Sequence, residues 1–482
     1  MAIMSPSFAY RPDPRFQDLG RDFADPVEAA DFPQTILRFR NDRAAATVGL
    51  ETLSDADWIR HFGRFEPLPG NQQVPLAMRY HGHQFRVYNP DLGDGRGFLF
   101  AQLREQGSDR LLDLATKGSG QTPWSRAGDG RLTLKGGVRE ILAATMLEAL
   151  GVPTSRAFSL VETGEALVRG DEPSPTRSAV LTRLSHSHIR FGTFQRLAYF
   201  DQRDLIAQLV DHVVETYFPH LADAADRPAA LLEATVAASA KLLSRWMVAG
   251  FVHGVLNTDN MVVTGESFDY GPWRFLPCND PNFTAAYFDH SGLYSFGRQP
   301  EAVFWNLQQL AACLTLVTDQ ARLLAALNGF SDAYRVALRA AMLDRLGVLS
   351  RDPDDDVELV NAAFRALADG GETLRWEPFF FDWFGGEASE RRALEGPRAG
   401  LYETEAFQDF RRRLAAFEPD RPERLADPVF QRPEPEALII DEVEALWAPI
   451  AAEDDWAPLH AKLARLEATR AAYALGDKKA AF

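Results

Sequence analysis

The chain has 482 residues, of which 46% are hydrophobic and 25% charged, as in an ordinary globular protein with a large core. Its net charge of −17 argues against a nucleic-acid binder, because phosphate backbones require basic surfaces. No stretch has the about 18 continuous apolar residues of a membrane helix and no signal peptide is apparent, so we expect a cytoplasmic protein that binds neither nucleic acid nor membranes.

The first 195 residues are predicted to form an N-terminal arm and a β-rich lobe. Residues 1–75 alternate proline-rich pieces with short helices, and we expect them to pack as an arm on the lobe that follows. A helix at 54–62 would begin at Ser54 as its N-cap. Residues 76–195 are β-rich, and their turn residues indicate an antiparallel sheet. The predicted elements are strands at 98–103, 111–116, 158–161 and 179–184, a helix at 132–150, and a turn around 171–175.

The rest of the chain is predicted to be helical. Residues 196–385 are expected to form a helical lobe, and residues 386–482 a helical C-terminal extension. Helices are predicted at 203–217, 229–249, 302–315, 319–327, 331–346, 356–368, 435–447 and 457–475, with an aromatic packing segment at 376–386 and a charged, partly mobile segment at 387–435. This order predicts an α+β fold of two lobes with a helical extension.

Residues 251–271 contain the pattern that points most directly to chemistry. A polar run from His253 to Asn260 leads into a predicted short strand, 261–264, and then to Asp269. Asn260 and Asp269 would flank a hairpin and could aim their oxygens at one point, and Mg²⁺ prefers such ligands together with a substrate's phosphates. Considered alone, an Asn and an Asp beside turns more often serve backbone hydrogen bonds, which is the alternative interpretation.

The same stretch follows the order of a kinase catalytic loop, H-R-D-x-x-x-x-N, and of the later D-F-G whose Asp holds Mg²⁺. His253 and Asn260 keep the loop's offset of seven residues, and residues 269–271, D-Y-G, stand at the D-F-G position. Val255 stands where the kinase base should be. The pattern therefore predicts a kinase-like metal site without the usual base.

A lysine, a glutamate and two glycine-rich turns upstream match a nucleotide site. Lys117 follows a β-like run and Glu140 lies in a predicted helix, and kinases use such a pair to hold the α- and β-phosphates. The turn at 93–96, G-D-G-R, recurs at 128–131, and glycines there let backbone N–H groups approach phosphate oxygens. Each feature alone is more often a solvated side chain or an ordinary turn. Their combination favours nucleotide binding.

Arg183 and Arg190 lie at the junction between the β-rich and helical parts, where a cleft would form. The alternative is that they pair with surface carboxylates, which are abundant in this chain. An acidic protein that binds a nucleotide has to concentrate its positive charge locally. We therefore assign both arginines to the predicted nucleotide site.

Several long motifs carry a closer resemblance. TKGSGQTPWSRAGDGR, GVREILA, LGVPTSRA, RLSHSHIRFGTF, HGVLNTDNM, FDYGPWRFL, DPNF and YSFGRQPEAVFWNLQQLA occur within about residues 78–312, and together they resemble the selenoprotein O family. The resemblance implies a protein-kinase-like fold and a protein adenylyltransferase (AMPylation) activity on Ser, Thr or Tyr hydroxyls. ATP would bind inverted relative to ordinary kinases, so that AMP is transferred and pyrophosphate is released.

The resemblance also implies roles for single residues. Asp259 would be the catalytic acid/base, Asn260 and Asp269 would ligate Mg²⁺ or Mn²⁺, and Glu140 would position Lys117. The nucleotide would be bound by Gly93, Gly95, Arg96, Lys117, Asp129, Gly130, Arg183, Arg190 and Asp269. After about residue 315 little of the family's pattern is seen, and the family's selenocysteine or cysteine near the C-terminus is absent, so no redox latch is expected.

Two other functions fit parts of the pattern. A kinase of proteins or small molecules would also use the Asn260–Asp269 metal pair, but Val255 at the base position counts against it. A non-catalytic, nucleotide-binding pseudokinase would have little need of a metal pair or of the Lys117–Glu140 pair. The favoured prediction is a Mg²⁺-dependent nucleotidyltransferase that uses ATP and acts on protein substrates.

Overall fold

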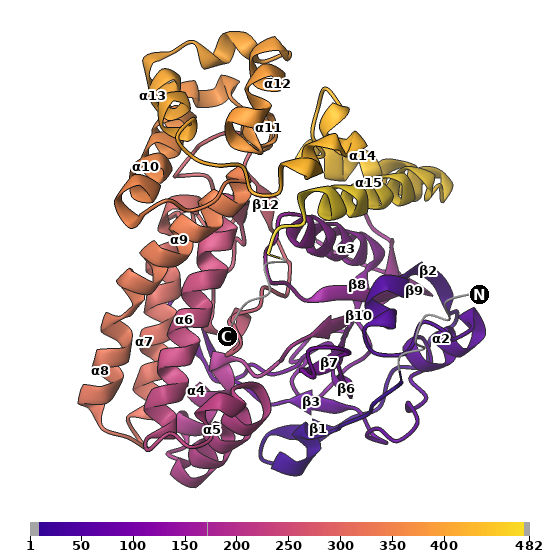
Figure 1. The fold of residues 1–482 in the computed structure, drawn as a ribbon. Coiled ribbons are helices and arrows are strands. Elements are labelled where there is room, and N and C mark those ends of the chain that lie inside the picture. Colours follow the sequence, from indigo (N-terminus) through magenta and orange to yellow (C-terminus); the bar gives the residue numbers. More distant parts are fainter. Residues whose placement is uncertain (1–8, 171, 477–482) are drawn as a thin grey trace, which may run out of the picture.

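The computed structural model describes residues 9–170 and 172–476 and is built around an antiparallel sheet (Figure 1). The strands run in the order β1-β3-β6-β7-β10-β9-β2, with β8 paired to β10. Their bounds are β1 Ala24–Pro26, β2 Ile36–Arg40, β3 Leu76–Met78, β6 Leu99–Arg104, β7 Leu111–Lys117, β8 Leu132–Thr133, β9 Arg156–Leu167 and β10 Thr176–Ser185. All these pairings are antiparallel, as predicted.

Both edge strands come from the N-terminal 75 residues, where the sequence analysis predicted only proline-rich pieces and short helices. β1 pairs with β3 at one edge and β2 with β9 at the other. The sequence of β2, Ile-Leu-Arg-Phe-Arg, has apolar residues at alternating positions, which is a strand signal. The predicted helix in this region is confirmed as α2 (Asp55–Phe62), and the Ser54 side chain caps it by accepting a hydrogen bond from the backbone N–H of Asp57.

The sheet buries apolar side chains on both faces. Side chains alternate between faces along a strand, so on β10 the neighbours Val180 and Leu181 belong to different hydrophobic clusters, and Phe158 of β9 shares the cluster of Val180. Phe158 stacks on Trp58 of α2, with ring centroids 4.8 Å apart. On the other face α3 (Leu134–Ala149) packs against β9 and β10, and α15 (Ala457–Tyr473) covers α3 from outside (Figure 1). This packing fixes α3 beside the strands that carry the candidate site.

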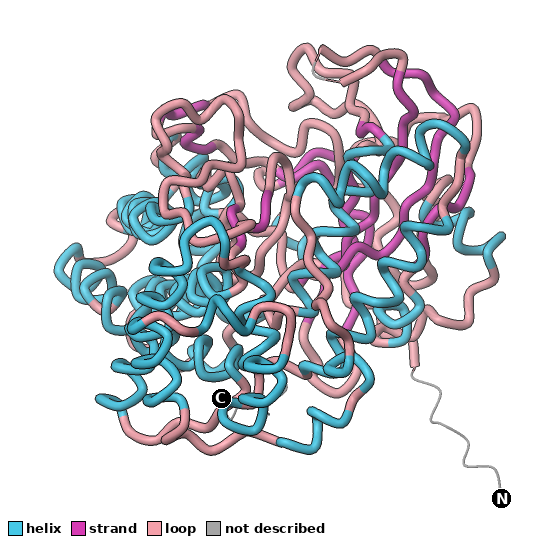
Figure 2. Tube along the Cα trace, turned by 90° about the horizontal axis from the view of Figure 1, so that it is seen from above, coloured by secondary structure: helices cyan, strands magenta, loops and turns pink. Residues whose placement is uncertain are grey.

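Most of the helices gather on the other side of the molecule from the sheet (Figure 2). Their bounds are α1 Asp42–Ala46, α4 Phe191–Tyr199, α5 Arg203–Tyr217, α6 Arg227–Val248, α7 Gln299–Leu314, α8 Gln320–Asn328, α9 Phe330–Leu346, α10 Pro353–Gly370, α11 Trp376–Trp383, α12 Glu390–Glu395, α13 Glu405–Leu414 and α14 Ile440–Glu453. Two short pairs of strands complete the fold: β4 Gly82–Gln84 with β5 Val87–Asn89, and β11 Phe251–Val252 with β12 Arg274–Phe275. No helix in these two described ranges is long and apolar enough to cross a membrane.

One predicted helix has different bounds in the structure, one helix was not predicted, and one predicted strand is absent. The helix predicted at 435–447 is α14, which begins at Ile440 and ends at Glu453. α4 was not predicted, because its Gly192 lowers helix propensity and its aromatic residues do not favour a helix. The strand predicted at 261–264 is absent, and Val262 forms only an isolated bridge with Arg190. The reason is that the backbone of residues 261–263 pairs with residues 189–191 and does not fold back toward Asp269. Asp171 of the predicted turn, the first eight residues and the last six lie outside the described residues.

Candidate active site

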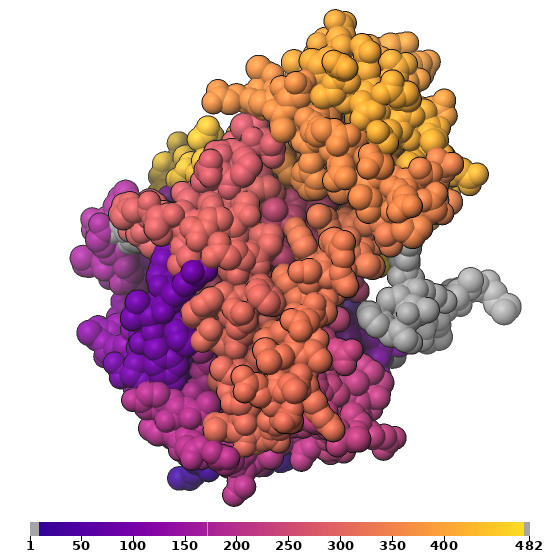
Figure 3. Space-filling model, turned by 90° about the vertical axis from the view of Figure 1, so that its left-hand side faces the viewer, coloured from indigo at the N-terminus to yellow at the C-terminus, as the bar shows by residue number. Residues whose placement is uncertain are grey.

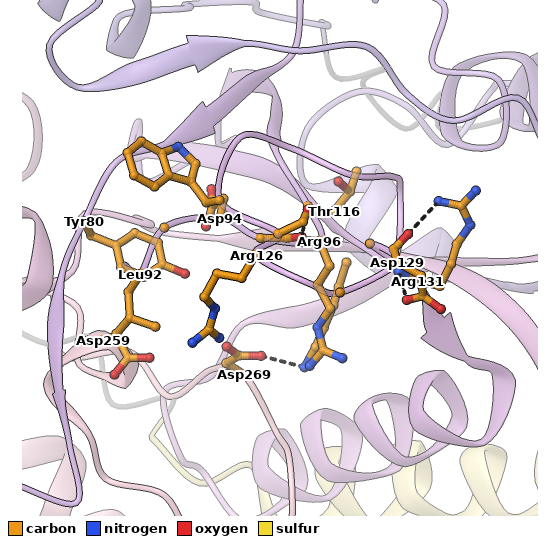
Figure 4. A pocket seen from close by; sticks show the side chains of 18 of the residues that line it. Tyr80, Leu92, Asp94, Arg96, Thr116, Arg126, Asp129, Arg131, Asp259 and Asp269 are labelled. Atoms are coloured by element: carbon orange, nitrogen blue, oxygen red, sulfur yellow. Dashed lines mark hydrogen bonds and ion pairs between the residues drawn. The ribbon is translucent and has the colours of Figure 1, made fainter. Parts of the chain in front are cut away.

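A pocket of about 610 Å³ brings together all the residues predicted to bind the nucleotide (Figure 4). Two glycine-rich loops form one wall, β7 and β10 form the floor, and Asp259 and Asp269 face them from the helical side. The polar and aromatic side chains that line it are Tyr80, Gln84, Asp94, Arg96, Thr116, Lys117, Trp124, Ser125, Arg126, Asp129, Arg131, Arg169, Arg183, Arg190, Asp259 and Asp269. Glu140 and Asn260 are predicted site residues that do not line it.

Lys117 joins the sheet to the helical side of the pocket. It is the last residue of β7, and its buried Nζ lies 2.5 Å from Oε1 of Glu140 on α3 and 2.6 Å from Oδ1 of Asp269. Glu140 is 2% exposed, so its charge depends on these neighbours for compensation. The buried Lys–Glu pair expected from the spacing is therefore present, and it extends to the predicted metal ligand.

Two buried arginines add positive charge around Asp269. Arg183 Nη1 lies 3.4 Å from Oδ1 of Asp269, and Arg190 Nη1 lies 3.9 Å from its Oδ2. Arg190 is the N-cap residue of α4, and it also donates hydrogen bonds to the backbone oxygen of Asp259 and to Asp94. Its guanidinium packs 4.5 Å from the ring centroid of Tyr80, which fixes its direction. Neither arginine pairs with a surface carboxylate, so that alternative does not hold.

Asp269 is held as a carboxylate. Burial opposes its ionisation, but the charges of Lys117, Arg183 and Arg190 outweigh burial and hold the pKa of Asp269 well below its usual range. Its backbone lies in the left-handed region, with φ of 62°. Such a conformation is uncommon for a residue other than glycine and points to a constraint imposed by the surroundings.

Asp259 has the opposite electrostatics, although it lies in the same pocket. Its Oδ1 is buried and has no hydrogen-bond partner among the described residues. Burial raises the pKa of Asp259 to about 6, and the charge of Arg190 only partly offsets this effect. Two carboxylates whose pKa values are pushed apart in one pocket suit different roles, one a stable anion and the other a proton acceptor.

Asn260 lies at the end of a short 3-10 helix, Thr258–Asn260, beside the pocket. Its side-chain Nδ2 donates a hydrogen bond to the backbone oxygen of Val255, 2.9 Å away. Within the described ranges no hydrogen bond to its Oδ1 is found, so this oxygen can accept a further partner. No group of three or more His, Cys, Asp or Glu side chains suited to a metal ion occurs in residues 9–170 and 172–476. A cation here would need oxygens from a substrate.

The two glycine-rich loops pack tightly against each other. A Cβ added to Gly93 would lie 2.4 Å from Cγ of Trp124, and one added to Gly95 would lie 2.9 Å from the Trp124 backbone oxygen. Thr122 Oγ1 donates to the backbone oxygen of Asp94, and Ser125 Oγ donates to that of Gly95. The glycines therefore allow the two loops to pack closely over the pocket. They would also allow the loop backbone to approach a ligand closely.

The second glycine-rich loop is also fixed by ion pairs at its G-D-G-R turn, residues 128–131. Asp129 accepts two hydrogen bonds from Arg169, and Arg131 pairs with Glu165 of β9 at 2.8 Å. Gly130 has φ of +70°, and a Cβ there would lie 2.2 Å from the backbone of Gly120. These contacts hold the loop in place without using Arg96 or Arg126.

Comparisons with known proteins agree with this geometry. The family model "Protein adenylyltransferase SelO" matches residues 6–467 of the chain. The chain belongs to the SelO family of protein adenylyltransferases. The match also corrects the expectation that the family's pattern fades after about residue 315, because it continues through the helical extension.

Curated relatives match this chain over 71% to 94% of their own length. The "Protein nucleotidyltransferase YdiU" of Synechococcus elongatus is 45% identical over 475 residues, 94% of this chain and 94% of the relative. Its namesake from Gloeobacter violaceus is 46% identical over 462 residues, again 94% of each chain. The relative from Vibrio cholerae is 38% identical over 73% of this chain and 71% of its own. The chain is thus a nucleotidyltransferase that uses ATP to transfer AMP to protein substrates.

Several side chains that line this SelO-family pocket were not predicted, and four of them stand out for their charge or aromatic ring. Arg126 projects into it, and Figure 4 shows its side chain directed toward the side of Asp259 and Asp269. The side chains of Arg96 and Arg126 are exposed and have no hydrogen-bond or ion-pair partner in the described part of the chain. The other three of these four residues are Tyr80, Asp94 and Trp124. Asp94 and Arg126 lie within or beside the two G-D-G turns, so those turns were a signal that could have identified them.

Proposed function

We propose that this pocket binds ATP between two lobes of a protein-kinase-like fold. The lobes would be residues 76–195 and 196–385, with residues 1–75 as an arm and residues 386–482 as a C-terminal extension. Support comes from the order of the parts, since the lysine on a strand, the glutamate on the adjacent helix and the two acidic loops follow the kinase arrangement. One observation carries the proposal, namely the buried contact of Lys117 with both Glu140 and Asp269.

The triphosphate would lie among the cationic side chains. Lys117, Arg183 and Arg190 are fixed by their partners and would form the inner part of the phosphate site. Arg96 and Arg126 have no hydrogen-bond or ion-pair partner among the described residues and would close on the outer part when the nucleotide binds. The backbone N–H groups of Gly93, Gly95 and Gly130 would supply further donors, as glycine-rich loops do for phosphates. Asp129 would act by holding its loop through Arg169.

Asn260 and Asp269 fit a divalent cation such as Mg²⁺ or Mn²⁺. Asp269 is ionised, and Oδ1 of Asn260 accepts no hydrogen bond in the described ranges, so each offers an oxygen of the kind that Mg²⁺ prefers. Two protein ligands are the usual number for a Mg²⁺ that is also bound by substrate phosphates. Bound there, the cation would neutralise charge on the phosphates during transfer.

Asp259 would accept the proton of the acceptor hydroxyl. The hydroxyl oxygen of a Ser, Thr or Tyr would form a bond to the α-phosphorus of ATP, and the bond from that phosphorus to the β-phosphate oxygen would break. The proton would go to Asp259, whose pKa of about 6 makes it a stronger base than an ordinary aspartate while it is still mostly ionised at pH 7. Lys117, Arg183 and Arg190 would stabilise the charge that develops on the departing pyrophosphate.

The test uses ATP labelled at the α- or the γ-phosphate, with serine-containing peptides as acceptors. We expect label only from the α position, and half-maximal transfer should need at least about tenfold more Mg²⁺ in Asp269→Asn and Asn260→Ala. Asp201→Asn is the control, because Asp201 pairs only with exposed Arg203. A wild-type Mg²⁺ dependence in either site variant would contradict the metal assignment, and label from the γ position would contradict the orientation of ATP.

A further inference from the structure

Five of the exposed large apolar side chains lie on or around the β4–β5 hairpin. They are Val87 at 70% exposed, Tyr199 at 57%, Phe200 at 51%, Tyr287 at 80% and Phe288 at 43%, and we call them the aromatic face. The remaining exposed large apolar side chains come from other segments of the chain: Val74, Val168, Leu324, Val336, Leu349 and Val357. Exposed apolar side chains that lie close together often mark an interaction site, whereas single exposed apolar side chains are normal on a protein surface.

Ring contacts attach two parts of the aromatic face to the β4–β5 hairpin. Phe288 contacts Phe85 in the turn of the hairpin, with ring centroids 5.8 Å apart, and Tyr287 contacts Phe288 at 5.1 Å. On the other side, Tyr199 stacks on Tyr88 of β5 at 5.5 Å. In Figure 3 the violet segment that contains the hairpin lies against the salmon segments near residues 280–310, on a face open to solvent.

The hairpin is fixed to the loop that carries Asp259. The backbone N–H of His83 donates to Oγ1 of Thr258 at 2.7 Å, and that of Phe85 donates to Oδ1 of Asn257 at 3.1 Å. At the start of β4, Gly82 lies so close to Asp259 that an added Cβ would be 3.1 Å from its Oδ1. The hairpin that the aromatic face surrounds therefore borders the pocket, which Gln84 of β4 lines, on the side of Asp259, where the acceptor hydroxyl would enter.

We propose that the aromatic face binds an extended segment of the acceptor protein that carries an aromatic or aliphatic side chain near the modified hydroxyl. The proposal rests on the proposed role of Asp259. Acceptors are proteins, and a hydroxyl that reaches Asp259 brings the residues on either side of it onto the surface around the hairpin. An apolar flanking side chain would bury its own surface and that of Tyr287 and Phe288, whereas a polar one would leave these rings in water.

Peptides and two double variants test this proposal. Each peptide has one Ser, Thr or Tyr acceptor among Gly and Ala, with either Phe or Asn placed at successive flanking positions, and transfer is measured with α-labelled ATP. For the wild type we expect Phe at one or more positions to raise kcat/KM by about tenfold, the effect of one well-buried ring. Tyr287→Ser with Phe288→Ser should abolish that preference and leave the KM for ATP unchanged. Leu324→Ser with Val336→Ser is the matched control, since both residues are exposed on α8 and α9.

The possible outcomes separate this proposal from the proposed function. A wild type that labels peptides without a flanking preference, or a Tyr287/Phe288 variant that keeps the preference, would overturn the aromatic face as an acceptor site and leave the proposed function intact. A wild type that labels no peptide would contradict both proposals. If that variant changed only the sedimentation coefficient, from dimer to monomer, the face would be an interface between copies and the proposal would again fail. Full activity of Asp259→Asn would instead refute the assignment of Asp259 as the base. It would leave the flanking preference untouched, because that preference is measured on the wild type and does not depend on which group takes the proton.

Discussion

Lys117 and Asp269 form an ion pair of 2.6 Å although 152 residues separate them in the sequence. The pair connects the last residue of a central strand to the D-Y-G segment of the helical part. It keeps Asp269 ionised and holds it over the floor of the pocket. Because the same ammonium group also binds Glu140 of α3, a change at any one of these three residues alters the charge balance of the other two.

We predict that Lys117→Met impairs both stability and activity. It leaves Glu140 buried with only Arg183 nearby, at 3.9 Å, and breaking a buried ion pair from one side costs about 3–5 kcal/mol. ATP affinity should fall as well, because an inner cation of the phosphate site is lost. Urea unfolding and calorimetric titration with ATP measure the two effects.

Two further variants separate the two roles of Lys117. Lys135→Met removes a more exposed pair with Glu444 and should cost under about 1 kcal/mol, with unchanged ATP affinity. Lys117→Met combined with Glu140→Leu should recover much of the stability and none of the ATP affinity. Recovery of ATP binding in the double variant would show that Lys117 acts only as a structural partner of Glu140.

The pH dependence of transfer should report Asp259. Its pKa is raised to about 6, so the carboxyl is protonated below pH 6 and cannot accept the hydroxyl proton there. We expect the single-turnover rate to fall about tenfold per pH unit below pH 6 and to be level above pH 7. Asp259→Asn should lower the rate by about 10²–10⁴ and remove this limb of the profile, with ATP binding retained. A wild-type rate that stays level down to pH 4.5 would exclude Asp259 as the base.

The order and type of elements could be predicted from local patterns. α5 has the predicted bounds, and α8 begins after the predicted Asp319, whose side chain caps the helix. In each, a continuous apolar stripe with clear end signals determined the element. The edge strand β1 was not predicted because its three residues show no alternation, and the five residues of β2 are too few for their alternation to stand out; the partners of both strands also lie far along the chain.

The residues of the site were predicted more successfully than their arrangement in space. Motif spacing brought Lys117, Glu140 and Asp269 together correctly, because each has a fixed place on a strand, a helix or a turn. The hairpin expected between Asn260 and Asp269 is absent, since the backbone after Asn260 bonds to residues 189–191. Arg126 was missed although it lies beside the second G-D-G turn, because the turn alone does not show that the loop folds over the pocket. That fold depends on close packing against Gly93, which is a tertiary contact.

Arg126→Ala should weaken ATP binding without destabilising the protein. Its side chain has no hydrogen-bond or ion-pair partner in the described part of the chain, so nothing is left unpaired when it is removed. We expect the Kd for ATP to rise about tenfold, and the difference from the wild type should shrink at high salt, because the contribution is electrostatic and exposed. Arg131→Ala is the comparison: it breaks the pair with Glu165 and should lower the melting temperature as well. Equal ATP affinity of Arg126→Ala and the wild type at low salt would place Arg126 outside the phosphate site.

Gly93→Ala should displace the second glycine-rich loop. The new Cβ would lie 2.4 Å from Cγ of Trp124, whose ring is held by a hydrogen bond from Nε1 to Asp25 at 2.9 Å. Such overpacking costs about 1–3 kcal/mol, and it should also raise the KM for ATP because the displaced loop carries Arg126 and Asp129. Adding Trp124→Ala removes the Cγ and Cδ2 atoms that the methyl group would meet at 2.4 and 2.6 Å, so the double variant should bind ATP better than Gly93→Ala alone. If the double variant bound ATP no better, the glycine would be needed for direct approach of its backbone to the nucleotide, and the packing explanation would be wrong.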